Sequence, residues 1–166
     1  ALIFAGGIGQ RMKSLDIPKQ FLEIEGKPII VRTMEHFSNH PMVDNIVVVC
    51  VENWLDVLNQ DIEKFGIKKV IKTVPGGATG YHSIHNGLLE VAKVASDDDI
   101  VLICDGVRPM LSEDLITTCI EDARKYESAV PVTPSIDSVL YSEDGENRNK
   151  NYERRKMFIT QAPQGY

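Results

Sequence analysis

The sequence lacks the features that mark several common classes of protein. Its apolar runs stay well short of the roughly 20 residues that a membrane-spanning helix needs, and it shows no signal-peptide pattern, so we expect a cytoplasmic protein with no membrane partner. The formal net charge of −6 argues against the broad basic surface of nonspecific nucleic-acid binding, so we expect no nucleic-acid partner. Only 7% of residues are aromatic, but 43% are hydrophobic, which suffices for one domain with a continuous core.

Cysteines are also few. Cys50, Cys104 and Cys119 lie far apart in apolar contexts and lack the C-x-x-C spacing that is typical of redox and metal-binding motifs. We therefore expect buried, reduced thiols rather than disulfides or metal ligands.

Short runs of β-branched residues alternate with stretches in which apolar residues recur about every 3.6 positions, the period of a helix. The predicted strands span residues 1–4, 46–51, 70–73 and 100–104. The predicted helices span residues 28–38, 53–65, 79–94 and 112–126. Near-continuous Val/Ile runs suit strands buried on both faces, so the pattern predicts an α/β fold with a parallel sheet in a single domain, residues 1–166. The polar stretch 142–155 breaks the pattern and is either a disordered loop or a projecting arm.

Motifs rich in glycine or charge follow three of the predicted strands. The loop AGGIG follows the first strand, the pair Gly76-Gly77 follows the third, and Asp105 follows the fourth. Ligands of open α/β sheets bind outside the carboxyl ends of the strands. We therefore expect these motifs to share one binding site.

The opening stretch AGGIGQRM matches neither of two common phosphate-binding motifs. GxxxxGKS/T is absent, and Met12 stands where the dinucleotide fingerprint has its third glycine. A glycine turn with exposed N–H groups, followed by Arg11 and Lys19, would suit a polyphosphate, although a tight turn with solvated cations fits the same residues. Asp105 and nearby Arg108 favour the ligand site, because one carboxylate can hold Mg²⁺ while substrate phosphates complete its shell.

Several motifs follow one another along nearly the whole chain: AGGxGxRM, PKQ, GG followed by Ser83, DGVRP, Asp137-Ser138, Arg154 and QAPQ. Their order resembles the cytidylyltransferases that make CDP-ribitol or CDP-methylerythritol. The resemblance implies a Rossmann-like nucleotidyltransferase sandwich, with a mostly parallel sheet and an arm at about residues 138–157. It also implies that CTP and a polyol phosphate are the substrates, that Mg²⁺ is the cofactor, and that the arm forms a homodimer.

The resemblance also assigns roles to matching positions. Arg11 and Lys19 would be the catalytic cations that contact the triphosphate, and Asp105 would hold the metal. Ser138 and Arg154 would bind the acceptor. The nucleotide-binding positions would be Ala5, Gly6, Gly7, Gly9, Gly76, Gly77, Ser83 and Arg108.

Some positions depart from the family pattern. Ala78 and Gly80 stand where the family usually has an acidic residue and an arginine, and Ala162 replaces a usual threonine. The family also continues beyond this segment with further acceptor-binding residues, so we expect a carboxyl-terminal segment to be missing here. The stretches GKPIIV, ENW and QAPQ favour ribitol 5-phosphate as the acceptor. A 2-C-methyl-D-erythritol 4-phosphate cytidylyltransferase of isoprenoid synthesis and an inactive CTP-binding relative stay open as alternatives.

Overall fold

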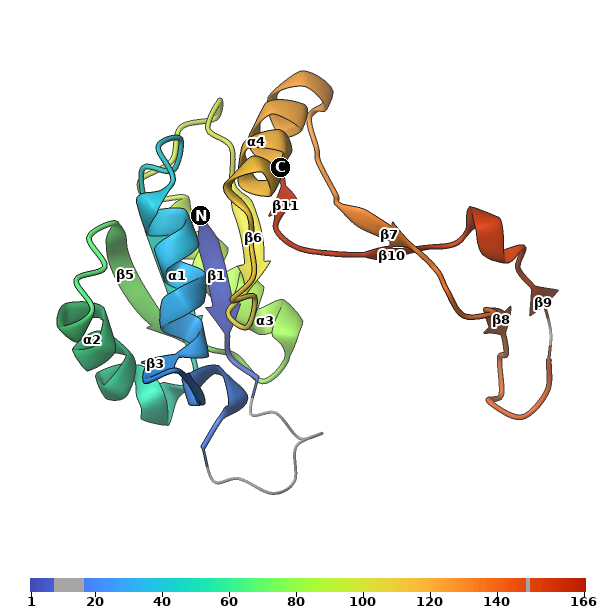
Figure 1. Cartoon of the computed structure of the whole chain (residues 1–166), viewed down its shortest axis with the longest axis horizontal. Coiled ribbons are helices and arrows are strands. Elements are labelled where there is room, and N and C mark those ends of the chain that lie inside the picture. Colours follow the sequence, from blue (N-terminus) through green and yellow to red (C-terminus); the bar gives the residue numbers. More distant parts are fainter. Residues whose placement is uncertain (8–16, 149) are drawn as a thin grey trace.

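The computed structural model describes residues 1–7, 17–148 and 150–166, and these residues are organised around a central sheet (Figure 1). In the described part of the chain, the sheet has five strands in the order β11-β6-β1-β4-β5. Its mutually parallel strands are β1 (Leu2–Ala5), β4 (Ile46–Cys50), β5 (Val70–Pro75) and β6 (Leu102–Asp105). The short strand β11 (Gln164–Gly165) runs antiparallel to β6. The predicted α/β fold with a mostly parallel sheet is confirmed.

Helices cover both faces of this sheet, with α1 in front of it and α3 behind it in Figure 1. The α-helices of the described residues are α1 (Ile29–Asn39), α2 (Leu55–Lys64), α3 (Gly80–Val91) and α4 (Glu113–Tyr126). Their ends differ from the predicted ends by no more than three residues. Short helical turns are η1 (Lys19–Phe21), η2 (Glu52–Trp54) and η3 (Arg154–Lys156), and a small hairpin joins β2 (Glu23–Ile24) to β3 (Lys27–Pro28).

Strand β4 shows why the Val/Ile runs become central strands. Ile46, Val48 and Cys50 pack into the cluster that contains the buried residues of α1, α2 and α4. Val47 and Val49 point to the opposite face, where they pack with residues of α3. Each fully buried Val or Ile side chain stabilises the fold by about 1.5–3 kcal/mol. A strand that is buried on both faces therefore contributes this stabilisation on both sides of the sheet.

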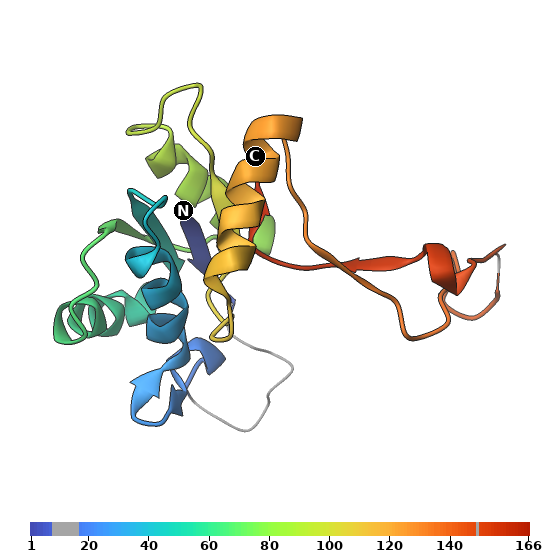
Figure 2. The same cartoon turned by 45° about the horizontal axis from the view of Figure 1, so that its top comes forward.

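The polar stretch 142–155 belongs to an arm that extends away from the body (Figures 1 and 2). We define the arm as residues 132–160, which includes the expected range 138–157. At its base β7 (Val132–Pro134) pairs antiparallel with β10 (Phe158–Thr160), and further out β8 (Leu140–Tyr141) pairs with β9 (Lys150–Asn151). Of the two alternatives for this stretch, the structure therefore shows the projecting arm.

The outer loop of the arm is a defined turn. The carboxylate of Asp144 accepts hydrogen bonds from the backbone N–H groups of Glu146 and Asn147 and from the Ser142 hydroxyl. These hydrogen bonds, above all those from Asn147, hold the pKa of the Asp144 carboxyl well below its ordinary value.

None of the helices in the described residues has the length and apolar character to cross a membrane.

The thiol groups of Cys50, Cys104 and Cys119 are all free and buried, as the sequence predicts. Burial raises the pKa of Cys50 and of Cys104 to about 12, and it also raises the pKa of Cys119.

We predict that native protein reacts only slowly with the thiol reagent DTNB at pH 8. A thiol with a pKa near 12 is ionised in roughly one molecule in ten thousand at this pH, against about a quarter for an ordinary cysteine. Absorbance of the released thiolate should show three reactive thiols after unfolding in guanidinium, which serves as the control. Rapid modification of any thiol in the native state would contradict the prediction.

Candidate active site

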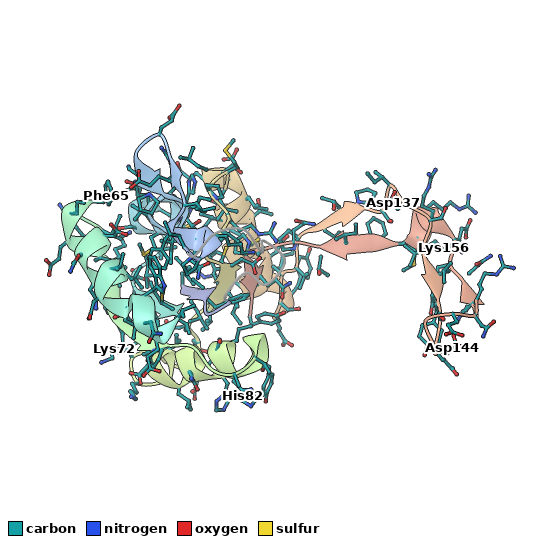
Figure 3. All side chains as sticks on the ribbon, turned by 90° about the horizontal axis from the view of Figure 1, so that it is seen from below. Phe65, Lys72, His82, Asp137, Asp144 and Lys156 are labelled. Atoms are coloured by element: carbon teal, nitrogen blue, oxygen red, sulfur yellow. The ribbon has the colours of Figure 1, made fainter. Side chains whose placement is uncertain are left out.

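The carboxyl ends of the parallel strands lie at one edge of the sheet, and Figure 3 views the molecule from this edge. Three of the predicted binding segments begin here, after β1, β5 and β6. The segment after β6 is held against the end of β1, because the N–H of Gly106 donates to the Phe4 carbonyl at 2.9 Å. The structure therefore brings together the segments that the sequence assigns to one site.

The loops after β1 and β5 approach each other closely at two glycines. A Cβ atom on Gly6 would lie 2.6 Å from Oγ of Ser83, and a Cβ atom on Gly76 would lie 3.1 Å from Cα of Gly6. A side chain at Gly6 would clash with the Ser83 hydroxyl, and one at Gly76 would push the two backbones a few tenths of an ångström apart. The two loops thus lie side by side at the carboxyl edge of the sheet.

Ser83 fixes the loop after β5 through hydrogen bonds. Its side chain is almost fully buried, and its Oγ accepts a hydrogen bond from the Gly77 N–H and donates to the Thr79 carbonyl, both at 3.0 Å. Thr79 also caps α3, because its Oγ1 accepts from the His82 N–H. Ser83, predicted to bind the nucleotide, thus fixes the loop that would bind it.

Gln20 fixes the loop after β1 in a similar way. The side chain is 1% exposed, and its Nε2 donates to the carbonyls of Ala5 at 2.7 Å and Gly7 at 3.2 Å. Next to it, Phe21 stacks on Trp54 with 4.7 Å between ring centroids, which anchors η1 and leaves Lys19 exposed at the start of this turn. Gln20 belongs to the PKQ motif, but the sequence alone assigns it no role, because a glutamine carries no signal that it will be buried.

Two of the predicted site residues lie outside the described part of the chain. Arg11 and Gly9 belong to residues 8–16, and their roles stay predictions.

Asp105 and Arg108 form an ion pair at the end of β6. Arg108 donates from Nε to Oδ2 of Asp105 at 3.1 Å, and its Nη2 lies 3.0 Å from the same oxygen. Its Nη1 donates to Oε1 of Gln161 at 3.0 Å. About a third of each charged side chain is exposed, so the pair adds little to stability and mainly sets the orientation of the carboxylate.

The donor set at Asp105 suits a hard cation. Arg108 uses Oδ2, which leaves Oδ1 of Asp105 for another ligand. The described residues hold no group of three or more His, Cys, Asp or Glu side chains that would form a closed metal site. Mg²⁺ fits such an arrangement, since it commonly binds one or two carboxylates and takes its remaining ligands from phosphates and water.

The predicted acceptor residues, Ser138 and Arg154, lie on the arm. Asp137 and Lys156, which are close to them in sequence, are seen in Figure 3 well away from the body. Nη1 of Arg154 donates to the Ile136 carbonyl at 3.3 Å. One chain by itself therefore does not bring these residues to Asp105.

The positions that depart from the family pattern have different surroundings. Ala162 is 8% exposed and packs in the main hydrophobic cluster, so its methyl group contributes to the core. Ala78 and Gly80 are exposed at the amino-terminal start of α3. A Cβ on Gly80 would meet no atom within 4 Å among the described residues.

A mostly parallel sheet with glycine loops, an exposed lysine and a carboxylate at the carboxyl edge is the architecture of an open α/β protein that binds its ligand at this edge, and the site suits the phosphates of a nucleotide. The sequence model of the IspD family, 2-C-methyl-D-erythritol 4-phosphate cytidylyltransferase, matches residues 1–166. The chain therefore belongs to this family of cytidylyltransferases, and the resemblance described from the sequence is confirmed.

Relatives of the chain fall in two named groups. It is 43% identical over 165 residues to a ribitol-5-phosphate cytidylyltransferase of Streptococcus agalactiae serotype Ia, covering 99% of this chain and 69% of the relative. It is 39% identical over 163 residues to a 2-C-methyl-D-erythritol 4-phosphate cytidylyltransferase of Clostridium botulinum, covering 98% of this chain and 69% of the relative. The crystal structure of 4-diphosphocytidyl-2C-methyl-D-erythritol synthase from Anaerococcus prevotii superposes with a TM-score of 0.79 at 27% identity, covering 99% of this chain and 67% of that one.

We predict that Gln20→Met weakens CTP binding and lowers the free energy of unfolding. Methionine fills a similar volume but cannot donate to the Ala5 and Gly7 carbonyls, and leaving buried polar groups unpaired costs about 1–3 kcal/mol. Urea unfolding and calorimetric CTP titration measure the two effects. Gln60→Met, an exposed position on α2, is the matched control and should change neither. Wild-type CTP affinity in Gln20→Met would show that the loop does not depend on this side chain.

Proposed function

We propose that this chain transfers the cytidylyl group of CTP to ribitol 5-phosphate, releasing pyrophosphate and forming CDP-ribitol. The observation that carries the choice of acceptor is the 43% identity to a ribitol-5-phosphate cytidylyltransferase, against 39% to a relative named for methylerythritol phosphate. The glycine loops, Lys19 and Asp105 supply the nucleotide side of the reaction.

The chemistry needs no nucleophile from the protein. A phosphate monoester is mostly a dianion near pH 7, because its second pKa is about 6. An oxygen of the acceptor phosphate forms a bond to the α-phosphorus of CTP, and the bond from that phosphorus to the oxygen bridging to the β-phosphorus breaks. The electron pair leaves with pyrophosphate, so no proton has to be removed by a general base.

The protein would act by alignment and by charge. Backbone N–H groups of the loop at Gly6 and Gly7 and the cation of Lys19 would hold the triphosphate. The loop at Gly76 and Gly77, fixed by Ser83, would hold the cytidine. These groups are positioned before the reaction, so they would offset charge on the α-phosphoryl oxygens without reorganising.

We include Mg²⁺ as the proposed cofactor. Asp105 would hold it through Oδ1, with phosphate oxygens completing the shell, and the ion would supply charge neutralisation at the transferring phosphoryl group. Arg108 would keep Oδ2 turned away from the ion.

We also propose a homodimer in which the arm of one copy completes the site of the other. The arm leaves its own body, and apolar side chains such as Ile136, Leu140 and Phe158 are exposed along it. Arg155 and Lys156 pair with Glu153, whereas the guanidinium of Arg154 donates to the backbone carbonyl of Ile136. Arg154 is therefore available to bind the phosphate of an acceptor.

The acceptor is tested with the full-length protein, CTP and Mg²⁺, by measuring pyrophosphate release with two acceptors in parallel. We expect turnover with ribitol 5-phosphate and kcat/KM at least tenfold lower with 2-C-methyl-D-erythritol 4-phosphate, because one buried polar group left unpaired costs about 1–3 kcal/mol and about 1.4 kcal/mol is a factor of ten. The reverse preference would assign the chain to the methylerythritol group. CTP binding without turnover on either acceptor would identify an inactive relative.

The dimer is tested by mixing two inactive variants, Lys19→Ala and Arg154→Ala. If the arm acts on the partner's site, each mixed dimer has one intact site, so equal mixing should restore about a quarter of wild-type activity. Each variant incubated alone under the same conditions is the control. Activity that stays at the level of the separate variants, although subunits exchange, would show that both residues act within one chain.

A further inference from the structure

The segment that carries Asp105 and Arg108 is held from outside the site by helix α1. We call residues 105–109, DGVRP, the acidic loop. Asp105 is the last residue of β6, and residues 106–109, which lead towards α4, belong to no helix or strand that would fix Arg108. The ion pair between Asp105 and Arg108 lies within this loop, so it cannot by itself fix the loop to the rest of the protein.

Thr33 makes the first attachment. It is fully buried in the middle of α1, and its Oγ1 accepts a hydrogen bond from the backbone N–H of Arg108 at 3.0 Å. The same hydroxyl lies 3.1 Å from the Ile29 carbonyl and 3.4 Å from the Gly106 carbonyl, and its single hydrogen can be donated to one of them at a time. Thr33 thus contacts polar backbone groups on both sides of Val107.

His36 makes the second attachment, one helical turn further along. Its Nε2 lies 2.9 Å from the carbonyl oxygen of Pro109. A carbonyl can only accept, so Nε2 carries the hydrogen in this contact. Thr33 and His36 share one face of α1, since residues three apart are neighbours on a helix.

Helix α1 also contacts the segment that presents Lys19. The N–H of Ile29, the first residue of α1, donates to the carbonyl of Leu22 at 2.9 Å, and Leu22 directly follows η1. One rigid element is therefore connected both to the lysine that would hold the triphosphate and to the carboxylate that would hold the metal.

We infer that Thr33 and His36 are positioning residues that set the place of Asp105 and Arg108 relative to the nucleotide. This role rests on the proposed function for its effect on catalysis, but the attachment of the acidic loop does not. Thr33 contributes more than His36, because the Thr33 side chain is fully buried, whereas His36 and the Pro109 carbonyl line a pocket between α1 and α4 where water can replace the imidazole.

The test compares Thr33→Val with Thr33→Ser. Valine keeps the shape but leaves the Arg108 N–H without a partner, whereas serine keeps the hydroxyl. Thr117→Val is the matched control, because Thr117 bonds to His40 at the far end of α1 and does not touch the acidic loop. Hydrogen exchange of the Arg108 amide, followed by NMR in the full chain, measures the attachment directly and needs no substrate.

We expect Arg108 to exchange at least tenfold faster in Thr33→Val and at the wild-type rate in Thr33→Ser and Thr117→Val. With a working acceptor, kcat should fall about ten- to a hundredfold in Thr33→Val, and serine should restore kcat. Wild-type protection of Arg108 in Thr33→Val, or an equal change in Thr117→Val, would overturn the inference. If the wild-type protein turns over neither acceptor, the proposed function fails, and the exchange measurement still decides the role of Thr33.

Discussion

The close approach of two backbones at the carboxyl edge of the sheet is the constraint on which the rest of the site depends. The loop after β1 and the loop after β5 meet across the end of the strand between them, where the Cys50 carbonyl accepts the Gly76 N–H at 2.7 Å. Glycine at positions 6 and 76 permits this approach, and the buried groups of Gln20 and Ser83 keep the two loops from separating. Without these contacts the N–H groups that face a ligand would not be held in a common orientation.

In the proposed reaction the body and the arm serve different substrates. The glycine loops and Lys19 lie on the body and would bind the nucleotide, whereas Arg154 lies on the arm and would bind the acceptor phosphate. The two parts meet at Gln161, which accepts from Arg108 and lies directly after β10 at the base of the arm. Asp105 is thus connected through Arg108 to the arm and through the acidic loop to α1, so its carboxylate is oriented from two directions.

Much of the fold follows from the sequence, because burial leaves a clear pattern in strands such as β4 and in the apolar stripe of α1. Ser112 likewise indicates the start of α4, since its Oγ accepts from the Leu115 N–H. Strand β11 has only two residues and no period to detect, and its place beside β6 depends on tertiary pairing. The roles of buried polar residues such as Gln20 and Thr33 are equally hard to predict, because the backbone groups that they hold at the site are 13 to 75 residues away and no local pattern identifies them.

The most direct test is a crystal structure of the full-length protein with CTP and Mg²⁺. We expect the triphosphate to lie against Gly6, Gly7 and Lys19, the cytidine against the loop at Gly76 and Gly77, and the metal on Asp105. Nucleotide bound elsewhere, for example in the cavity at the amino edge of the sheet beside Arg124, would contradict the site described for this chain.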